Sequence, residues 1–240
     1  MKKELFVIGD VHGQITMLKE MLAHWDEEVQ TLLFLGDIAD RGEDSKACLE
    51  LVHELVTEEK AICLKGNHEE MLQKFLLFPE EKYEHYRING GMETLRDLLP
   101  ETSLQNTSPE ELAQKVQKEY PWLLPYLESL PLYKEWGKFV FVHAGVDLSL
   151  SNWKDSSPRD FVWIREEFYR HQNQTGKTFV FGHTPTPVLH ENQTDHTLFQ
   201  KNDMIGMDGG AVYGGVLHGL VFNEETILSH FKVENNGYSW

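Results

Sequence analysis

Apolar residues gather in short continuous runs in the first third of the chain, and a segment with helical periodicity follows each run. The runs predict buried strands at residues 5–8, 31–35 and 61–64. The segments after them predict helices over about 15–25, over about 44–56 and up to residue 78. Short apolar strands that alternate with helices are typical of a largely parallel sheet with both faces covered.

The segment from about 79 to 135 has a different pattern. It is rich in glutamate, holds six of the nine prolines and predicts a series of short helices. We interpret it as a helical insertion that either caps the core or projects into solvent. Further strands are predicted at residues 139–142, 178–181, 204–207, 216–222 and 226–231. The last two are expected to pair antiparallel. Because no repeat array or linker separates these elements, we expect one domain over residues 1–240.

Polar side chains follow five of the predicted strands, at the point where each strand ends. In chain order they are Asp10, His12, Asp37, Asp40, Arg41, Asn67, His68, His143 and His183. In open α/β sheets, ligands bind outside the carboxyl ends of the strands. We therefore expect these side chains to meet at one edge.

The residue types in this set indicate a metal site. Carboxylate, amide and imidazole groups without a thiolate suit Mn, Fe or Zn. Six candidate ligands exceed the four of a structural zinc site, but they fit two ions that share one carboxylate. Two such ions can clamp a phosphoryl group and activate a bridging water. His68 is placed to protonate a leaving alkoxide, and the Arg41 guanidinium suits phosphate oxygens. The pattern predicts phosphoester hydrolysis by direct attack of a metal-bridging hydroxide.

Composition restricts the partners. The formal net charge of −17 repels phosphate backbones, so nonspecific nucleic-acid binding is not expected. No apolar run approaches the roughly 18 residues that cross a membrane, so no membrane partner is expected. Cys48 and Cys63 form no disulfide framework, which favours a cytoplasmic location. The pattern leaves the oligomeric state open.

Five ordered motifs resemble those of the phosphoprotein phosphatase family, within the calcineurin-like metallophosphoesterases. They are Gly9-Asp10-Val11-His12-Gly13, Gly36-Asp37-Ile38-Ala39-Asp40-Arg41-Gly42, Gly66-Asn67-His68-Glu69, His143-Ala144-Gly145 and Gly182-His183. Three further segments resemble the bacterial and phage branch, namely Asn89-Gly90-Gly91, Trp163-Ile164-Arg165-Glu166 and Asp208 to Gly215. The resemblance runs from residue 9 to about residue 222.

The resemblance implies an α/β (α+β) fold, a four-layer α-β-β-α sandwich of two mixed sheets flanked by helices, with a helical insertion. It implies that the first of two divalent ions is held by Asp10, His12 and Asp37. Asp37 would bridge to the second ion, which Asn67, His143 and His183 complete. His68 would be the general acid oriented by Asp40, and Arg41 and Arg165 would bind substrate phosphate. Manganese is the first choice of metal, with iron or zinc as alternatives.

Three functions are compatible with these residues. An intact Asp40-Arg41-Gly42 beside His68 favours a serine/threonine protein phosphatase. The alternative is a hydrolase of dinucleoside polyphosphates such as diadenosine tetraphosphate, and a more remote one is a non-catalytic metal-binding scaffold. The substrate is accordingly a phosphoprotein or a phosphorylated small molecule. Trp122, Trp136 and Trp153 either line a substrate cleft or pack in the core, and the usual burial of large aromatic side chains favours the core.

Overall fold

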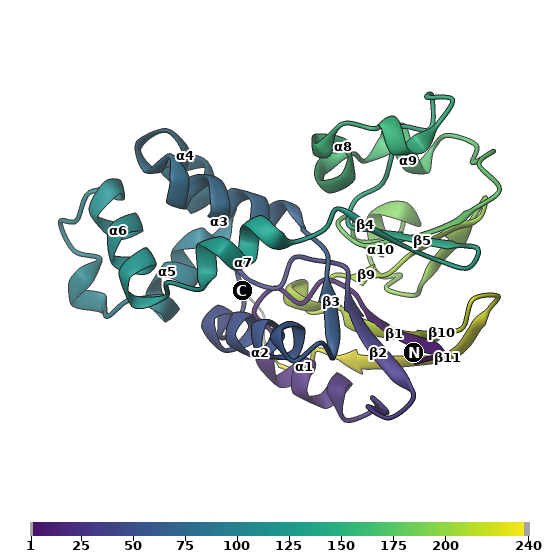
Figure 1. The fold of residues 1–240 in the computed structure, drawn as a ribbon, viewed down its shortest axis with the longest axis horizontal. Helices are drawn as coiled ribbons and strands as arrows, with labels where there is room; N and C mark the ends of the chain where they lie inside the picture. The colour runs from purple at the N-terminus through teal and green to yellow at the C-terminus, as the bar shows by residue number, and fades with distance from the viewer. Residues whose placement is uncertain (1, 238–240) are drawn as a thin grey trace.

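Two β-sheets lie face to face in the computed structural model, which describes residues 2–237 (Figure 1). The larger sheet has the order β11-β10-β1-β2-β3, and β9 pairs with β10. Its strands are β1 (Glu4–Ile8), β2 (Gln30–Phe34), β3 (Ala61–Cys63), β9 (Asp208–Gly209), β10 (Val216–Phe222) and β11 (Ile227–Glu234). Strands β1, β2 and β3 run parallel, whereas β10 pairs antiparallel with both β1 and β11. The predicted antiparallel pair at the end of the chain is confirmed.

The smaller sheet has the order β4-β5-β6-β8-β7. Its strands are β4 (Tyr133–Trp136), β5 (Phe139–Val142), β6 (Thr178–Phe181), β7 (Phe199–Lys201) and β8 (Met204–Gly206). The three central strands are parallel, and the two edge strands β4 and β7 are antiparallel to their neighbours. Both sheets are therefore mixed.

Side-chain alternation along the strands explains why the two sheets stack. Leu5 and Val7 of β1 pack with Phe139 and Phe141 of β5 in a hydrophobic cluster between the sheets. Phe6 of β1 points the other way and joins the cluster beneath the helices of the first sheet. Successive strand side chains face opposite sides, so each strand contributes to two layers of core.

Helices cover the outer face of each sheet. Helices α1 (Ile15–Leu22) and α2 (Ser45–Thr57) share a hydrophobic cluster with the larger sheet. Helices α8 (Pro158–Trp163), α9 (Glu166–Tyr169) and α10 (Thr186–Leu189) contribute to the cluster outside the smaller sheet. The predicted four-layer α-β-β-α sandwich is thereby confirmed.

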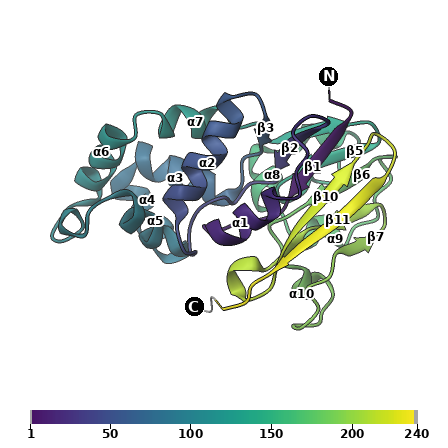
Figure 2. The same cartoon turned by 90° about the horizontal axis from the view of Figure 1, so that it is seen from below.

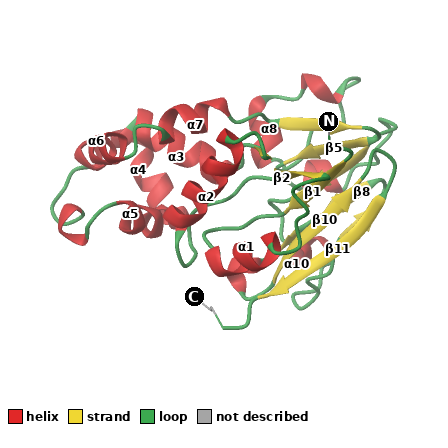
Figure 3. Cartoon of the chain, turned by 60° about the horizontal axis from the view of Figure 1, so that its bottom comes forward, coloured by secondary structure: helices red, strands yellow, loops and turns green. Residues whose placement is uncertain are grey.

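A group of helices extends beyond the sandwich at one end, as Figures 2 and 3 show. It consists of α3 (Asn67–Leu77), α4 (Pro79–Tyr86), the π-helical segment η1 (Arg87–Gly91), α5 (Met92–Leu98), η2 (Glu101–Ser103), α6 (Pro109–Glu119) and α7 (Leu123–Ser129). Ser108 and Glu111 form a capping box at the start of α6, where Pro109 takes the first position. Buried side chains of these helices, such as Phe75 and Leu127, belong to the same hydrophobic cluster as those of α2.

Some local expectations were wrong. The helix predicted to reach Trp25 ends at Leu22, and residues 133–135, expected within the helical insertion, belong to strand β4. An edge strand with only half-buried residues gives little hydrophobic signal, which explains why β4 was missed. The short 3₁₀ segments η3 (Trp153–Asp155) and η4 (Ala211–Tyr213) were also not anticipated.

The three tryptophans that were candidates for a substrate cleft belong to the core instead. Trp153 is buried outside the smaller sheet, and Trp122 and Trp136 pack against hydrophobic clusters. Cys48 and Cys63 are buried free thiols. Among the described residues, no helix combines the length and the apolar character needed to cross a membrane. The predicted cytoplasmic location stays a prediction.

Candidate metal and phosphate site

The loops that follow strands β1, β2, β3 and β6 surround a pocket of about 220 Å³. Its lining residues are His12, Asp37, Arg41, Asn67, His68, Asn89, Trp163, Arg165, His183, Pro185, Asp208 and Tyr213. Seven of these were predicted from the sequence. The other three predicted residues, Asp10, Asp40 and His143, are buried and hydrogen-bonded to or beside the lining side chains.

His12 and Asp37 face each other on one side of the pocket. The Nδ1–H of His12 donates to the Ala39 carbonyl at 3.1 Å, so its Nε2 carries the lone pair that can bind a metal. In this structure that Nε2 accepts a hydrogen bond from the Arg41 guanidinium at 3.1 Å. That Nε2 lies 3.6 Å from Asp37 Oδ2. A ring nitrogen fixed to a backbone carbonyl is the usual support for a metal-binding imidazole.

On the other side of the pocket, the ring nitrogens of two histidines converge on Asn67. Asn67 Oδ1 lies 2.8 Å from His183 Nδ1 and 3.0 Å from His143 Nε2. His143 Nε2 is also 3.4 Å from Asp37 Oδ1, while its Nδ1–H donates to the Leu35 carbonyl at 2.9 Å. Asp37 therefore presents one oxygen to each side of the pocket.

Distances alone define two groups of potential ligands within the described residues. One contains His12, Asp37 and His68, and the other contains Asp37, His143 and His183, with ligand atoms within 4.8 Å of one another in each. Asp37 belongs to both groups, as expected for a bridging carboxylate. The first group contains His68 where the family resemblance implies Asp10.

Asp10 lies behind the pocket. Its Oδ2 accepts the His183 backbone N–H at 2.9 Å, and its Oδ1 is buried without a hydrogen-bond partner among the described residues. Burial, and after it the charges of Asp208 and Asp37, raise the pKa of Asp10. A buried carboxylate oxygen with no donor is costly unless a cation meets it.

Burial sets the charge states of the neighbouring groups. It lowers the pKa values of His12, His143 and His183, which favours the neutral imidazoles that bind metals. Burial also raises the pKa of Asp208 to about 6. For Asp37 burial acts in the same direction, but His143 and the other surrounding histidines outweigh it and lower its pKa.

His68 and Asp40 form a buried pair beside the pocket. The two are joined by a 2.6 Å hydrogen bond between His68 Nδ1 and Asp40 Oδ2. The second carboxylate oxygen accepts hydrogen bonds from the hydroxyls of Tyr86, at 2.9 Å, and Thr94. Tyr86 and Thr94 come from the helical insertion and were missed by the sequence analysis. The nearest signal was the Asn89-Gly90-Gly91 segment between them.

Glu69 is a second residue whose role the motifs did not reveal. Its Oε2 accepts the backbone N–H groups of Asp37 at 2.8 Å and of Gly66 at 2.9 Å, and its Oε1 accepts that of Ile38 at 2.8 Å. One buried carboxylate therefore ties together the loops after β2 and β3. Burial raises the pKa of Glu69 to about 7. The Gly66-Asn67-His68-Glu69 motif contained this residue without indicating its contacts.

The backbone of the site is strained. Five of the ten predicted site residues have positive φ angles, namely His12, Asp37, Asp40, Arg41 and His183. Each such non-glycine conformation costs on the order of 1–3 kcal/mol and persists only when the surroundings enforce it. Concentrated strain of this kind is typical of functional sites.

The two predicted phosphate ligands, Arg41 and Arg165, both reach the pocket. The Arg165 guanidinium donates to the His183 carbonyl and to the Thr184 hydroxyl, both at 3.1 Å. The Arg41 guanidinium lies over the Tyr213 ring, 5.7 Å from its centroid. Phosphate binding by these residues stays a prediction.

Comparison with known proteins decides the family. The calcineurin-like phosphoesterase family matches residues 4–209. The chain belongs to this family. It is therefore a phosphoester hydrolase, and the predicted enzyme class is confirmed.

Relatives of this phosphoesterase include enzymes with different substrates. It is 27% identical to the asymmetrical bis(5'-nucleosyl)-tetraphosphatase PrpE of Oceanobacillus iheyensis, over 93% of this chain and 90% of that protein. It is 26% identical to serine/threonine-protein phosphatase 1 of Salmonella typhimurium, over 90% of each protein. A crystal structure of a candidate diadenosine tetraphosphatase has a TM-score of 0.67 at 21% identity, covering 99% of this chain and 96% of that one. The protein phosphatase relative agrees with the predicted phosphoprotein phosphatase resemblance.

The residues of this phosphoesterase fit the two metal ions on which its family depends. Two ligand groups share Asp37, burial favours the neutral imidazoles, and Asp10 offers an oxygen without a hydrogen-bond partner in the described part of the chain. Oxygen and imidazole donors suit Mn, Fe or Zn. Manganese as the native ion and the role of each ligand stay predictions.

Proposed function

We propose that this phosphoesterase hydrolyses dinucleoside tetraphosphates with two divalent ions held by Asp10, His12, Asp37, Asn67, His143 and His183. The observation that carries this proposal is the composition of the pocket wall. Arg41 and Arg165 line the same cavity as the rings of Trp163 and Tyr213. Guanidinium groups bind phosphate oxygens, and flat aromatic rings stack on nucleobases. A tetraphosphatase relative that aligns over 90% of its length supports the same substrate class.

The chain's own side chains would position the substrate and move a proton. When bound, the ions would supply Lewis-acid polarisation of the phosphoryl group and an activated water. Arg41 and Arg165 would hold the phosphate oxygens. Asp40 would stabilise the protonated His68 ring through the 2.6 Å hydrogen bond, and His68 would protonate the leaving oxygen.

A phosphoserine or phosphothreonine protein phosphatase is the second candidate, which the sequence argument placed first. The buried pair of His68 and Asp40 favours it. An alkoxide is a poor leaving group and needs protonation, whereas the phosphate oxygen of a departing nucleotide needs it much less. The same pair therefore distinguishes the two substrates experimentally.

The test compares kcat/KM in Mn²⁺ for diadenosine tetraphosphate and for a phosphothreonine peptide. We expect at least about a tenfold preference for the dinucleotide, with AMP and ATP as products. The reverse preference would assign the protein phosphatase activity. No turnover of either substrate by the metal-loaded protein would overturn both assignments.

The variant His68→Asn sharpens this comparison. Loss of a general acid typically lowers kcat by about 10²–10⁴. We expect that loss for the phosphothreonine peptide and a smaller loss for diadenosine tetraphosphate. Equal losses for the two substrates would contradict the assigned proton donation, and metal analysis of the variant checks that both ions are retained.

A further inference from the structure

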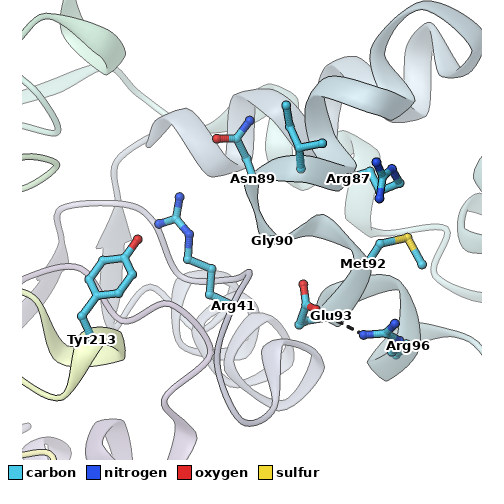
Figure 4. A pocket seen from close by; sticks show the side chains of 9 residues that line it. Arg41, Arg87, Asn89, Gly90, Met92, Glu93, Arg96 and Tyr213 are labelled. Atoms are coloured by element: carbon cyan, nitrogen blue, oxygen red, sulfur yellow. Dashed lines mark hydrogen bonds and ion pairs between the residues drawn. The ribbon is translucent and has the colours of Figure 1, made fainter. Parts of the chain in front are cut away.

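A second pocket, of about 520 Å³, adjoins the metal pocket (Figure 4). The two cavities share three lining residues, Arg41, Asn89 and Tyr213. The remaining lining residues of the second pocket are Arg87, Ile88, Gly90, Met92, Glu93 and Arg96. We call it the insertion pocket, since segment η1 and helix α5 supply all of these except Arg41 and Tyr213.

Positive charge gathers in this region of an otherwise acidic chain. The protein has a net charge of −17 and six arginines, at positions 41, 87, 96, 159, 165 and 170. Three of the six line the insertion pocket, and Arg165 lines the metal pocket beside it. Arginines concentrated in a cavity attract anions that the rest of the surface repels.

The two outer arginines are held in place by neighbouring acids. The Arg87 guanidinium donates to Glu84 at 2.7 and 2.8 Å, and that of Arg96 donates to Glu93 at 3.2 Å. Each guanidinium carries five N–H donors, so these contacts leave donors free for a ligand. Figure 4 shows Arg87 and Arg96 on the side of the pocket away from Tyr213, with Arg41 between them and Tyr213.

The pocket also exposes apolar surface. Ile88 is 65% exposed and Tyr213 is 56% exposed, and both line the cavity. Exposed apolar side chains can bury the apolar surface of a ligand, and arginines beside them can bind its anionic groups. A nucleotide, which joins an aromatic base to phosphates, matches both properties.

The insertion pocket is connected directly to the metal loops. The Arg41 backbone N–H donates to the Gly90 carbonyl at 3.3 Å. Gly90 has a φ of +100°, and a Cβ at this position would lie 2.5 Å from Arg41 Cγ. A ligand in the insertion pocket therefore contacts the same arginine that reaches the metal pocket.

We propose that the insertion pocket binds the nucleotide part of the substrate that extends beyond the phosphate held at the metals. Its phosphates run from Arg41 toward Arg87 and Arg96, and its base packs on the apolar surface of the cavity. This inference rests on the proposed hydrolysis of dinucleoside tetraphosphates and assigns the insertion a role in substrate selection.

The test uses the metal-loaded double variant Arg87→Gln/Arg96→Gln. Its matched control is Arg170→Gln, which removes another exposed arginine paired with an acid, Glu166, outside both pockets. Two measurements are made at fixed free Mn²⁺, namely KM for diadenosine tetraphosphate and inhibition of p-nitrophenyl phosphate hydrolysis by ATP.

In the double variant both KM and the ATP inhibition constant should rise by about tenfold or more, because charge-assisted hydrogen bonds are lost. Hydrolysis of p-nitrophenyl phosphate itself should stay within about twofold of wild type, since this small ester does not reach the insertion pocket.

The outcomes separate this inference from the proposed function. If the wild type fails to cleave diadenosine tetraphosphate but ATP inhibition still depends on the two arginines, the proposed function fails and the nucleotide pocket stands. An ATP inhibition constant that is unchanged in the double variant would contradict nucleotide binding in the insertion pocket. Inorganic triphosphate that inhibits as strongly as ATP overturns the contact with the base. The double variant could instead raise KM for an acidic phosphopeptide and leave KM for nucleotides unchanged. That result would show that the insertion pocket binds a protein substrate and not a nucleotide.

Discussion

The strand-end loops and the helical insertion both build the site, but the sequence encodes their contributions differently. The loops carry their functional groups in short motifs, each placed at the end of a strand. The insertion supplies Tyr86 and Thr94 to Asp40, and Asn89 to the pocket wall. Tyr86 lies in no segment that resembled a motif.

The difference follows from how each region is positioned. A side chain directly after a parallel strand is placed by the strand itself, so its location is readable from local pattern. Tyr86 reaches Asp40 across 46 positions in the sequence, and the two meet through tertiary packing that includes α4 against α3. The supporting residues of a site are therefore harder to predict than the ligands they support.

The largest expected effect comes from the loops. Asp37→Asn removes the carboxylate shared by both ligand groups, so metal binding on both sides of the pocket should weaken. We expect kcat to fall by more than the roughly 10²–10⁴ typical of losing a general acid. Steady-state kinetics on p-nitrophenyl phosphate measures the fall, and a decrease of less than about tenfold would contradict the bridging assignment.

The next largest effect is expected from the contact of the helical insertion with Asp40. Tyr86→Phe removes one hydrogen bond from buried Asp40 and leaves the carboxylate oxygen less well satisfied. The cost of such a loss is about 1–3 kcal/mol, which corresponds to a decrease in kcat of about 5- to 150-fold if it is felt in the transition state. We expect the decrease to be larger for a phosphothreonine peptide than for a substrate with a good leaving group. If the variant loses stability but keeps the wild-type kcat for both substrates, the contact is only structural.

A smaller effect is expected at the junction of the two regions. Gly90→Ala places a methyl group 2.5 Å from Arg41 Cγ in a backbone with a φ of +100°. Arg41 must shift, so KM for phosphoesters should rise several-fold. Gly176→Ala is the matched control, because Gly176 also has a positive φ of +72°, but beyond its two chain neighbours no described residue comes within 4 Å of the added Cβ. Equal KM changes in both variants would argue against a specific contact with Arg41.

The smallest effect concerns stability alone. In the metal-free protein the pKa of Asp208 is about 6, against about 3.9 in an unfolded chain. Between these values the folded state binds more protons than the unfolded state, so this group's contribution to stability is lost as the pH rises through about 4 to 6. Asp208→Asn cannot titrate and should lack this loss, so the EDTA-treated variant should be more stable than wild type at pH 7 and should differ less from wild type at pH 4. Urea unfolding at pH 4 and pH 7 measures this, and parallel pH profiles would refute the raised pKa.

The sequence predicted most of the sandwich, because its strands are buried on both faces and read as continuous apolar runs. Strand β5 was predicted with its observed bounds, Phe139–Val142, whereas the half-buried edge strand β4 was missed. All ten predicted site residues lie in or directly behind the pocket. The hydrogen bonds of Glu69 to the loop after β2 and of Tyr86 to Asp40 could not be predicted from the local sequence pattern. Both join segments that are distant in the sequence.

The arrangement of ligands around Asp37 predicts that this phosphoesterase holds two metal ions that share one carboxylate. Equilibrium dialysis against Mn²⁺, followed by elemental analysis, measures the ions bound per chain in wild type and in Asp37→Asn. We expect two ions per wild-type chain and a marked weakening of both in the variant. One ion or none in the wild type, or two tightly held ions in Asp37→Asn, would contradict it.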